Sequence, residues 1–231
     1  MPNPTFPGFP RATIEFLMQL TENNEREWFK QNQDRYEAQV REPALAFIRA
    51  MAPRLRKLSR NFVASDRKQG GSMMRPQRDT RFASDKTPYK TNIGIQFRHA
   101  AGKDVHAPGF YLHIDPAEVF VGVGMWRPDA PALAAVRQRL VDKPKLFIKA
   151  VEKPEFQKWF TLGGESLKRP PAGVDPQHAL IEHLKRKDHI AMAQLTHAQL
   201  RSPKLLDTVE ERFAAAKPYI VFLCDALDVP C

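Results

Sequence analysis

The sequence predicts a single α+β domain in which a mainly antiparallel sheet packs against N-terminal and C-terminal helices. Apolar residues recur at helical spacing in residues 14–58 and again in residues 209–227. Between these segments, three short runs within residues 93–123 alternate apolar and other side chains, as strands with one buried face do. The 231 residues, of which 42% are hydrophobic, suffice for one large core.

Residues 1–10 are expected to form an extended lead-in, so that the α+β domain spans residues 11–231. Prolines and a glycine interrupt regular structure in this lead-in. Phe6 and Phe9 are the side chains in it that we expect to pack against the body of the domain. No internal repeat, low-complexity tract or shift in composition requires a second domain.

Three helices are predicted after the lead-in. The first begins after Pro10, and Asn23 or Asn24 is suited to cap the second. Pro53 is expected to kink the third helix or to end it early, because proline removes a backbone hydrogen bond. The apolar positions are Ile14, Leu17 and Met18 in the first helix, Trp28, Tyr36 and Val40 in the second, and Leu45, Ile48, Ala52, Leu55 and Leu58 in the third.

Three strands should follow as an antiparallel meander, because turn-like segments at residues 100–104 and 115–118 separate the alternating runs. The alternating residues are Ile93, Ile95 and Phe97, then Phe110, Leu112 and Ile114, then Val119, Val121 and Val123. Pro131 is expected to open a further helix, with a shorter one at residues 144–151. Residues 163–176 predict a loop, residues 189–195 fit a strand or a helix, and the C-terminal helix contains Pro218.

The chain is strongly basic. It has 36 Lys and Arg residues against 26 Asp and Glu residues, a formal net charge of +10 and a pI near 9.7. Seven of the basic residues and only two acidic residues lie within residues 67–90, so this short segment holds half of the net charge. The charge favours phosphates, polyanions and acidic partners, without specifying which of them.

The sequence predicts a soluble, cytoplasmic protein that does not enter a membrane. The N-terminus lacks the basic start and apolar stretch of a signal peptide, and no apolar run approaches the length of a membrane span. Cys224 and Cys231 match neither a zinc pattern nor a disulfide framework, so we interpret them as reduced thiols.

Residues 78–92 (RDTRFASDKTPYKTN) form the most unusual segment, since they are too charged for a core and too aromatic for a solvated loop. Arginine forks and ammonium groups can grip the oxygens of a phosphate or carboxylate, and the two aspartates can orient them. Alternatively, the charges neutralise one another in an ordered loop that ties helices to the sheet. The candidate ligand-binding residues here are Arg78, Asp79, Arg81, Asp85, Lys86, Tyr89 and Lys90.

Two further positions can join this candidate site. Lys168 and Arg169 form a second basic element in a loop stiffened by prolines, which can meet residues 78–92 across a cleft or be a solvated turn. Trp126 follows the third predicted strand directly, after Gly122 and Gly124. These glycines predict a bulge or close packing, because no dinucleotide or phosphate-loop fingerprint surrounds them.

Complete signatures of catalysis, cofactor binding or metal binding are missing from the sequence. No nucleophile elbow surrounds a serine, and the seven histidines are dispersed without a zinc pattern. His113 alternates with the apolar residues of the second strand and is expected at the surface. We therefore predict no cofactor and no metal site, and the sequence names no reaction.

Several segments together resemble the conserved bacterial and fungal proteins of domain of unknown function 2461. They are NNEREWF at 23–29, residues 78–97, GFYLHIDP at 109–116, VGVGMWRP at 121–128 and LKRPPAGVDPQH at 167–178. The resemblance covers most of the chain and implies a single α+β domain. It implies no activity and no catalytic residue, and the positions that it would carry over are the ten candidate residues named above.

Three hypotheses follow for function. The first is a small anionic ligand held in a basic polar cleft built on residues 78–92, with an enzymatic role left open. The second is nucleic-acid binding, with Phe82, Tyr89 and Trp126 as stacking platforms among basic residues. The third is a structural or protein-interaction domain whose charged loop is an internal ion-pair network. The sequence does not predict the oligomeric state.

Overall fold

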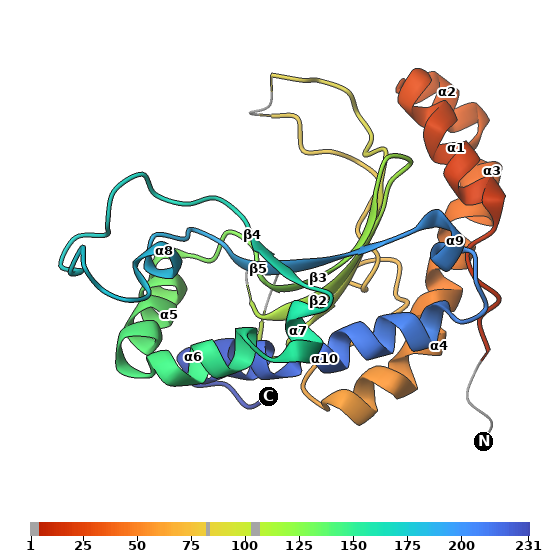
Figure 1. Cartoon of the computed structure of the whole chain (residues 1–231). Helices are drawn as coiled ribbons and strands as arrows, with labels where there is room; N and C mark the ends of the chain where they lie inside the picture. The colour runs from red at the N-terminus through yellow and green to blue at the C-terminus, as the bar shows by residue number, and fades with distance from the viewer. Residues whose placement is uncertain (1–4, 82–83, 103–106) are drawn as a thin grey trace.

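A five-stranded antiparallel sheet forms the centre of the computed structural model, which describes residues 5–81, 84–102 and 107–231 (Figure 1). The strand order is β1-β2-β3-β5-β4, so the predicted meander is extended by two strands from later in the chain. The strands are β1 (Ile93–Arg98), β2 (Gly109–Ile114), β3 (Val119–Met125), β4 (Thr161–Gly163) and β5 (His189–Leu195).

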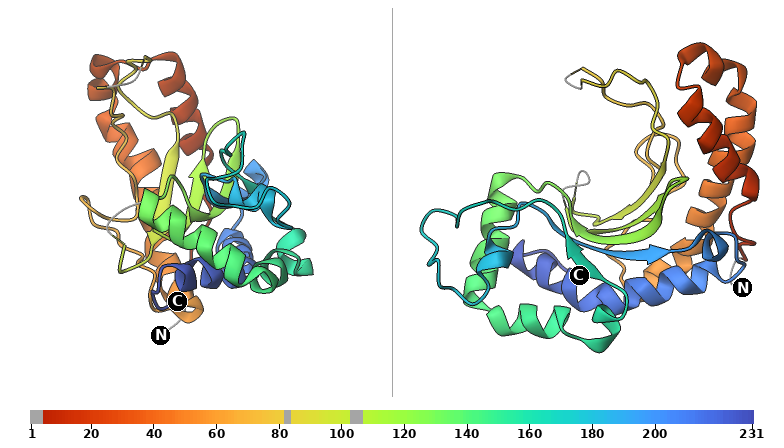
Figure 2. Two further views of the ribbon diagram at one scale, coloured as in Figure 1. Left: turned by 90° about the vertical axis from the view of Figure 1, so that its left-hand side faces the viewer. Right: turned by 45° about the horizontal axis from the view of Figure 1, so that its top comes forward.

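Helices from both ends of the chain cover one face of this sheet (Figures 1 and 2). This arrangement confirms the predicted α+β fold. The helices are α1 (Arg11–Glu22), α2 (Arg26–Gln31), α3 (Gln33–Tyr36), the π-helical η1 (Glu37–Arg41), α4 (Glu42–Leu58), α5 (Ala130–Asp142), α6 (Pro144–Val151), α7 (Pro154–Gln157), α8 (Ile181–Leu184), α9 (His197–Leu200) and α10 (Leu205–Ala226). None of these helices is both long enough and apolar enough to cross a membrane, within the residues described.

The segment before α1 packs into the core. Residues 5–10 form neither helix nor strand, and Phe6 and Phe9 are buried as expected. Their rings lie 5.5 and 5.8 Å from the ring of Phe47 in α4, measured between centroids. Aromatic burial thus fixes the described part of the lead-in.

The second predicted helix begins and divides differently from the prediction. Glu25 occupies the N-cap position of α2 without a side-chain cap, and Asn32 separates α2 from α3. Asn24 instead donates to the carbonyl of Tyr89 at 2.9 Å and accepts from its N–H at 3.0 Å. A long-range pairing therefore uses the side chain that the sequence suggested as a cap.

The prediction that Pro53 kinks or ends the third helix early is wrong as regards its end, since α4 continues to Leu58. Met51 and Leu55, on either side of the proline, are both buried. Their burial stabilises the helix on both sides, which offsets the lost backbone hydrogen bond.

Alternation along the strands separates a covered face from an open face. The buried residues on the covered face include Ile93, Ile95, Phe97, Phe110, Leu112, Ile114, Val119, Val121 and Val123. Residues 189–195, which the sequence left undecided, form β5 because Ala191, Ala193 and Leu195 add to the same face. Phe213 of α10 packs on this face, with ring centroids 5.9 Å from Phe97 and 4.6 Å from Phe110.

The other face of the sheet is concave and open (Figure 2). Within the described residues, the helices lie on the convex side and beside the sheet, and loops rise around the concave side. The side chains that alternate with the core therefore point away from the helices that cover the convex face.

Candidate functional site

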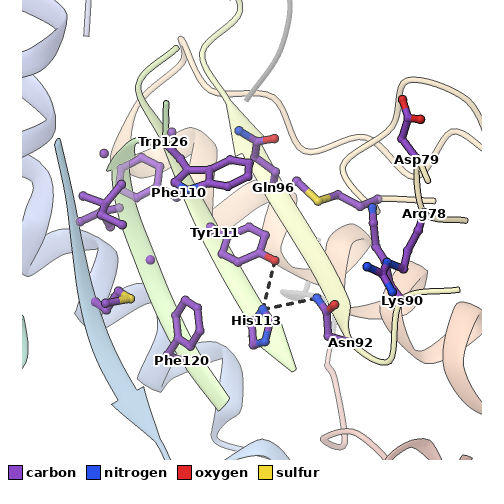
Figure 3. Close-up of a pocket in the computed structure, with 17 residues that line it drawn as sticks. Arg78, Asp79, Lys90, Asn92, Gln96, Phe110, Tyr111, His113, Phe120 and Trp126 are labelled. Carbon is purple, nitrogen blue, oxygen red and sulfur yellow. Dashed lines mark hydrogen bonds between the residues drawn. The ribbon is translucent and has the colours of Figure 1, made fainter. Parts of the chain in front are cut away.

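The concave face holds a cavity of about 610 Å³, a size typical of small-molecule sites. Strands β1, β2, β3 and β5 form its floor, and the loop that precedes β1 forms one wall (Figure 3). The lining residues are Met74, Arg78, Asp79, Lys90, Asn92, Gln96, Gly109, Phe110, Tyr111, His113, Phe120, Gly122, Val123, Gly124, Trp126, Ile190 and Met192.

Aromatic side chains dominate the floor of this cavity. Tyr111 and His113 alternate with the core residues of β2, so both project from the open face. Phe120 of β3 stacks on His113, with ring centroids 4.6 Å apart and an interplanar angle of 12°. The floor is thus aromatic and largely apolar, and it carries a few polar side-chain atoms.

Tyr111, His113 and Asn92 form a hydrogen-bonded cluster at the centre of the floor (Figure 3). The Nδ1 atom of His113 lies 3.2 Å from the Tyr111 hydroxyl and 3.4 Å from the Asn92 side-chain nitrogen. Since the amide nitrogen can only donate, Nδ1 acts as an acceptor, which places the proton of the neutral ring on Nε2.

Burial keeps this cluster uncharged near neutral pH. It lowers the pKa of His113, against the opposing effect of Asp115 and Glu118. Burial also raises the pKa of Tyr111 to about 12. The neutral imidazole therefore keeps an Nε2–H group that can donate a hydrogen bond to a ligand.

The charged wall is a paired arm of the chain. Arg78 donates its backbone N–H to Pro88 at 2.9 Å, and Lys90 donates its own to Pro76 at 2.8 Å. Tyr89 turns away from the cavity and stacks on Phe29 of α2, with centroids 4.0 Å apart and planes at 13°. Tyr89 therefore anchors the arm to the N-terminal helices rather than lining the pocket.

Ion pairs organise the side chains of this arm. Arg78 Nη1 donates to Asp85 at 2.5 Å and also to the hydroxyl of Thr87. Arg81 grips both carboxylate oxygens of Asp79, at 3.0 and 2.7 Å. Hydrogen bonding from Arg81 lowers the pKa of Asp79 to about 2, and the Thr87 N–H, followed by Arg78, does the same for the pKa of Asp85.

Lys90 differs from the arginines, because its ammonium group donates to the carbonyl of Arg75 at 3.2 Å and forms no ion pair with a described carboxylate. Burial lowers its pKa, and the positive charge of Arg75 lowers it further. A partly desolvated cation of this kind gains from an anionic partner.

The structure brings four of the ten sequence-predicted residues to the cavity and leaves six outside its lining. Those that line it are Arg78, Asp79, Lys90 and Trp126, and those outside are Arg81, Asp85, Lys86, Tyr89, Lys168 and Arg169. Asp85 and Arg81 act through the side chains they pair with, whereas Lys86 donates to the carbonyl of Thr80 at 2.9 Å.

Topology explains why the two basic loops do not share the cavity. The charged arm leads into β1, at one edge of the sheet, while Lys168 and Arg169 follow β4 at the opposite edge. Both of these side chains are exposed. The separation of β1 from β4 arises from the placement of β5, which the sequence left undecided.

Asp188 fastens the rim beside Trp126. Its buried carboxylate accepts the N–H of Arg127 at 2.7 Å through Oδ1 and the N–H of Glu165 at 2.8 Å through Oδ2. Arg127 has a φ of 49°, a left-handed conformation that costs free energy outside glycine. The carboxylate thus holds a strained turn at the end of β3 against the loop that follows β4.

Replacing Asp188 with alanine is expected to lower the free energy of unfolding by about 2 kcal/mol, because two backbone donors lose their acceptor. Urea denaturation measures the loss, with Asp34→Ala on the exposed surface of α3 as the matched control. A midpoint shift no larger than that of the control would contradict the anchoring role of Asp188.

Several site residues were absent from the sequence prediction. Tyr111, Asn92, Gln96 and Phe120 match no catalytic or binding signature, and His113 was expected merely as a surface residue. The available signal was that Tyr111 and His113 share the strand face opposite the core. Among the described residues, no group of three or more His, Cys, Asp or Glu side chains is placed to hold a metal ion, and both cysteines are free.

Comparison with known proteins identifies the family of the chain. A family model described as a conserved hypothetical protein (DUF2461) matches residues 12–222. Neither curated proteins nor solved structures give a significant match. Because the family model covers most of the chain, the protein belongs to the conserved hypothetical protein family DUF2461.

Proposed function

We propose that the cavity binds a small ligand bearing a phosphate or carboxylate group, and that Arg78 and Lys90 hold the anion. The observation that carries this proposal is the division of the cavity into an uncharged aromatic floor and one cationic wall. Such a division suits a ligand with an apolar body and one charged end.

The internal pairing of the arm supports this role. Asp85 and Thr87 engage Nη1 of Arg78, so they fix the guanidinium while its remaining N–H groups can serve a ligand. Asp79 also lines the cavity, but Arg81 neutralises its carboxylate through two hydrogen bonds. The anion would therefore meet a preorganised arginine and a partly buried lysine.

The hypothesis of a purely structural ion-pair network finds less support. The side chains of Asp85, Asp79 and Arg81 are 57%, 46% and 77% exposed, and solvent screens exposed pairs so that they contribute little to stability. Arg78→Ala and Asp85→Ala should therefore leave thermal stability nearly unchanged, whereas a buried network would be strongly destabilised by the loss of either partner.

We expect Arg78→Gln and Lys90→Gln each to weaken binding of ribose 5-phosphate about tenfold or more, because each removes one charge-assisted contact. Isothermal titration calorimetry at low salt measures the change, with inorganic phosphate as a second probe. Lys168→Gln and Arg169→Gln remove the same charge outside the cavity and are the matched controls. Equal losses in the controls and in the site variants would show that the attraction is nonspecific, against the proposal.

Nucleic-acid binding is the second candidate, favoured by the 48% exposure of Trp126 beside the aromatic floor. Of the other two expected stacking platforms, Phe82 lies outside the described residues and Tyr89 already stacks on Phe29. Arg127 covers this ring, with its guanidinium carbon 4.8 Å from the ring centroid. Binding of single strands would weaken steeply with salt.

If the bound ligand is chemically transformed, Tyr111 and His113 would supply the proton donor and acceptor.

A further inference from the structure

The ring of Tyr111 lies along the sheet instead of standing on it. A Cβ atom on Gly94 of β1 would come within 2.7 Å of the Tyr111 hydroxyl, and one on Gly122 of β3 would come within 3.4 Å of its Cδ1. The Gly94 contact requires the ring to recline from β2 over the backbone of β1, because an upright tyrosine would carry its hydroxyl far above the neighbouring strand. The Gly122 contact is an ordinary van der Waals distance, so Gly94 is the residue whose missing side chain leaves space for the ring.

The reclining ring offers one broad face to the cavity. The opposite face rests on the strands, and hydrogen bonding to His113 at 3.2 Å fixes the hydroxyl at the edge. His113 and Phe120 border the ring, with centroids 6.0 and 6.1 Å from that of Tyr111. This geometry leaves Tyr111 oriented as a platform on which a second flat ring can stack.

Amide side chains stand beside this platform. Gln96 is directly paired with Tyr111 in the register of β1 and β2, and Asn92 bonds His113 at the other end of the ring. Both amides line the cavity (Figure 3). An amide can donate and accept together, which matches the polar edge of a nitrogen heterocycle better than it matches a hydrocarbon ring.

We propose that the ligand is a mononucleotide-like molecule, with a planar heterocycle stacked on Tyr111 and a phosphate at Arg78 and Lys90. This inference rests on the proposed anion site and specifies the class of ligand. The cavity of about 610 Å³ accommodates a ligand of this size. A phosphate ester without a planar heterocycle would leave the aromatic floor in contact with water, so the floor would add little to its binding free energy.

The test compares ligands that all carry a phosphate group and differ in whether they also carry a heterocyclic base. AMP, GMP, CMP and UMP are titrated into the full chain beside ribose 5-phosphate, which lacks a base. At least one nucleotide should bind tenfold or more tightly than ribose 5-phosphate, the scale of one base stacked on an aromatic side chain. Tyr111→Phe should retain this advantage, and Tyr111→Leu, which keeps an apolar side chain, should abolish it.

Two outcomes would overturn the inference. The first is equal affinity of all four nucleotides and ribose 5-phosphate, with every affinity still reduced by Arg78→Gln. This result would support the anion site but would show that no base stacks on Tyr111. The second is a nucleotide that still binds more tightly than ribose 5-phosphate in Tyr111→Leu, which would place the base away from Tyr111. If the wild type binds none of the phosphate ligands, the proposed function itself is refuted.

Oligonucleotides distinguish a free nucleotide from a strand. A single-stranded octanucleotide should bind no more than about tenfold more tightly than the best mononucleotide, since Tyr111 is the single platform that this proposal assigns. A gain of a hundredfold or more, with a steep salt dependence, would identify a nucleic acid as the ligand and overturn the mononucleotide assignment. Circular dichroism of Tyr111→Leu and Tyr111→Phe confirms that each variant is folded before its affinity is interpreted.

Discussion

Replacing Gly124 with alanine is expected to lower the free energy of unfolding by about 4 kcal/mol. Gly124 has a φ of 116°, which side chains other than glycine rarely adopt, and this strain costs about 1–3 kcal/mol. The added Cβ would also lie 2.0 Å from the carbonyl oxygen of His189 on the neighbouring strand. Because that atom is backbone, β3 and β5 must move apart, at a further cost of about 1–3 kcal/mol.

Gly122→Ala is the matched control, since it lies two residues earlier on the same strand. Its added Cβ meets nothing closer than 3.4 Å, and its backbone conformation does not favour glycine. We expect a change below about 1 kcal/mol. Urea denaturation of both variants measures the difference, and a Gly124→Ala variant as stable as Gly122→Ala would contradict the close approach of β5 at this position.

Gly124 also shows how far a sequence pattern can predict local structure. A bulge or close packing was expected at Gly122 and Gly124. The register of β3 and β5 runs unbroken through Gly124 opposite Ile190, so close packing applies and a bulge does not. The sequence could not decide between them, because the partner strand lies more than sixty residues away and was itself undecided.

The fold was predictable in segments whose apolar residues recur with the spacing of one type of secondary structure. Alternation in residues 93–98, 109–114 and 119–125 predicts β1, β2 and β3, because burial of every second residue is typical of a strand and does not fit a helix. Asn24 and Pro53 mark the limits of such reasoning. A cap and a helix break are local expectations, and tertiary contacts at Tyr89 and on either side of Pro53 override them.

The candidate site was predictable in its charged wall and at Trp126. Arg78, Asp79 and Lys90 were identified by composition, which needs no knowledge of neighbours, and Trp126 by its place directly after the third predicted strand. Tyr111 can recline as a platform because a glycine, Gly94, occupies the position beside its hydroxyl on β1, and that relation depends on strand register. Lys168 and Arg169 fail to reach the cavity for the same reason, since the order of the strands places β4 far from β1.

His189 is expected to make the protein lose stability as the pH falls below 6.5. Burial lowers the pKa of His189 to about 3, with further lowering by Arg186, Arg137 and His183, whereas the unfolded chain binds a proton near pH 6.5. Between these values the unfolded state holds the additional proton, so acid favours unfolding. The loss approaches about 1.4 kcal/mol per pH unit within the window.

The covered face of the sheet offers this histidine little compensation for a positive charge. His189 is 1% exposed, and its Nε2 atom has no hydrogen-bond partner among the described residues. Asp188, the adjoining residue, raises this pKa with the smallest effect of those acting on it, and its carboxylate accepts the backbone N–H groups of Arg127 and Glu165. Protonation therefore requires local opening or unfolding rather than a new ion pair.

The measurement is the free energy of unfolding in urea at pH 6.5 and pH 4.5. Wild type should lose about 2–3 kcal/mol over this interval, and His189→Leu should lose markedly less. The pKa values of Asp79 and Asp85 are lowered to about 2 in the folded protein, and unfolded aspartates bind protons only at about pH 3.9. The interval lies above both values, so these carboxylates contribute little to the slope. His113 and His183, whose pKa values burial also lowers, contribute to the slope that remains in His189→Leu. An identical dependence of stability on pH in wild type and His189→Leu would assign the acid sensitivity to other groups. In either case, ligand affinities are measured above pH 6.5, where this loss of stability is absent.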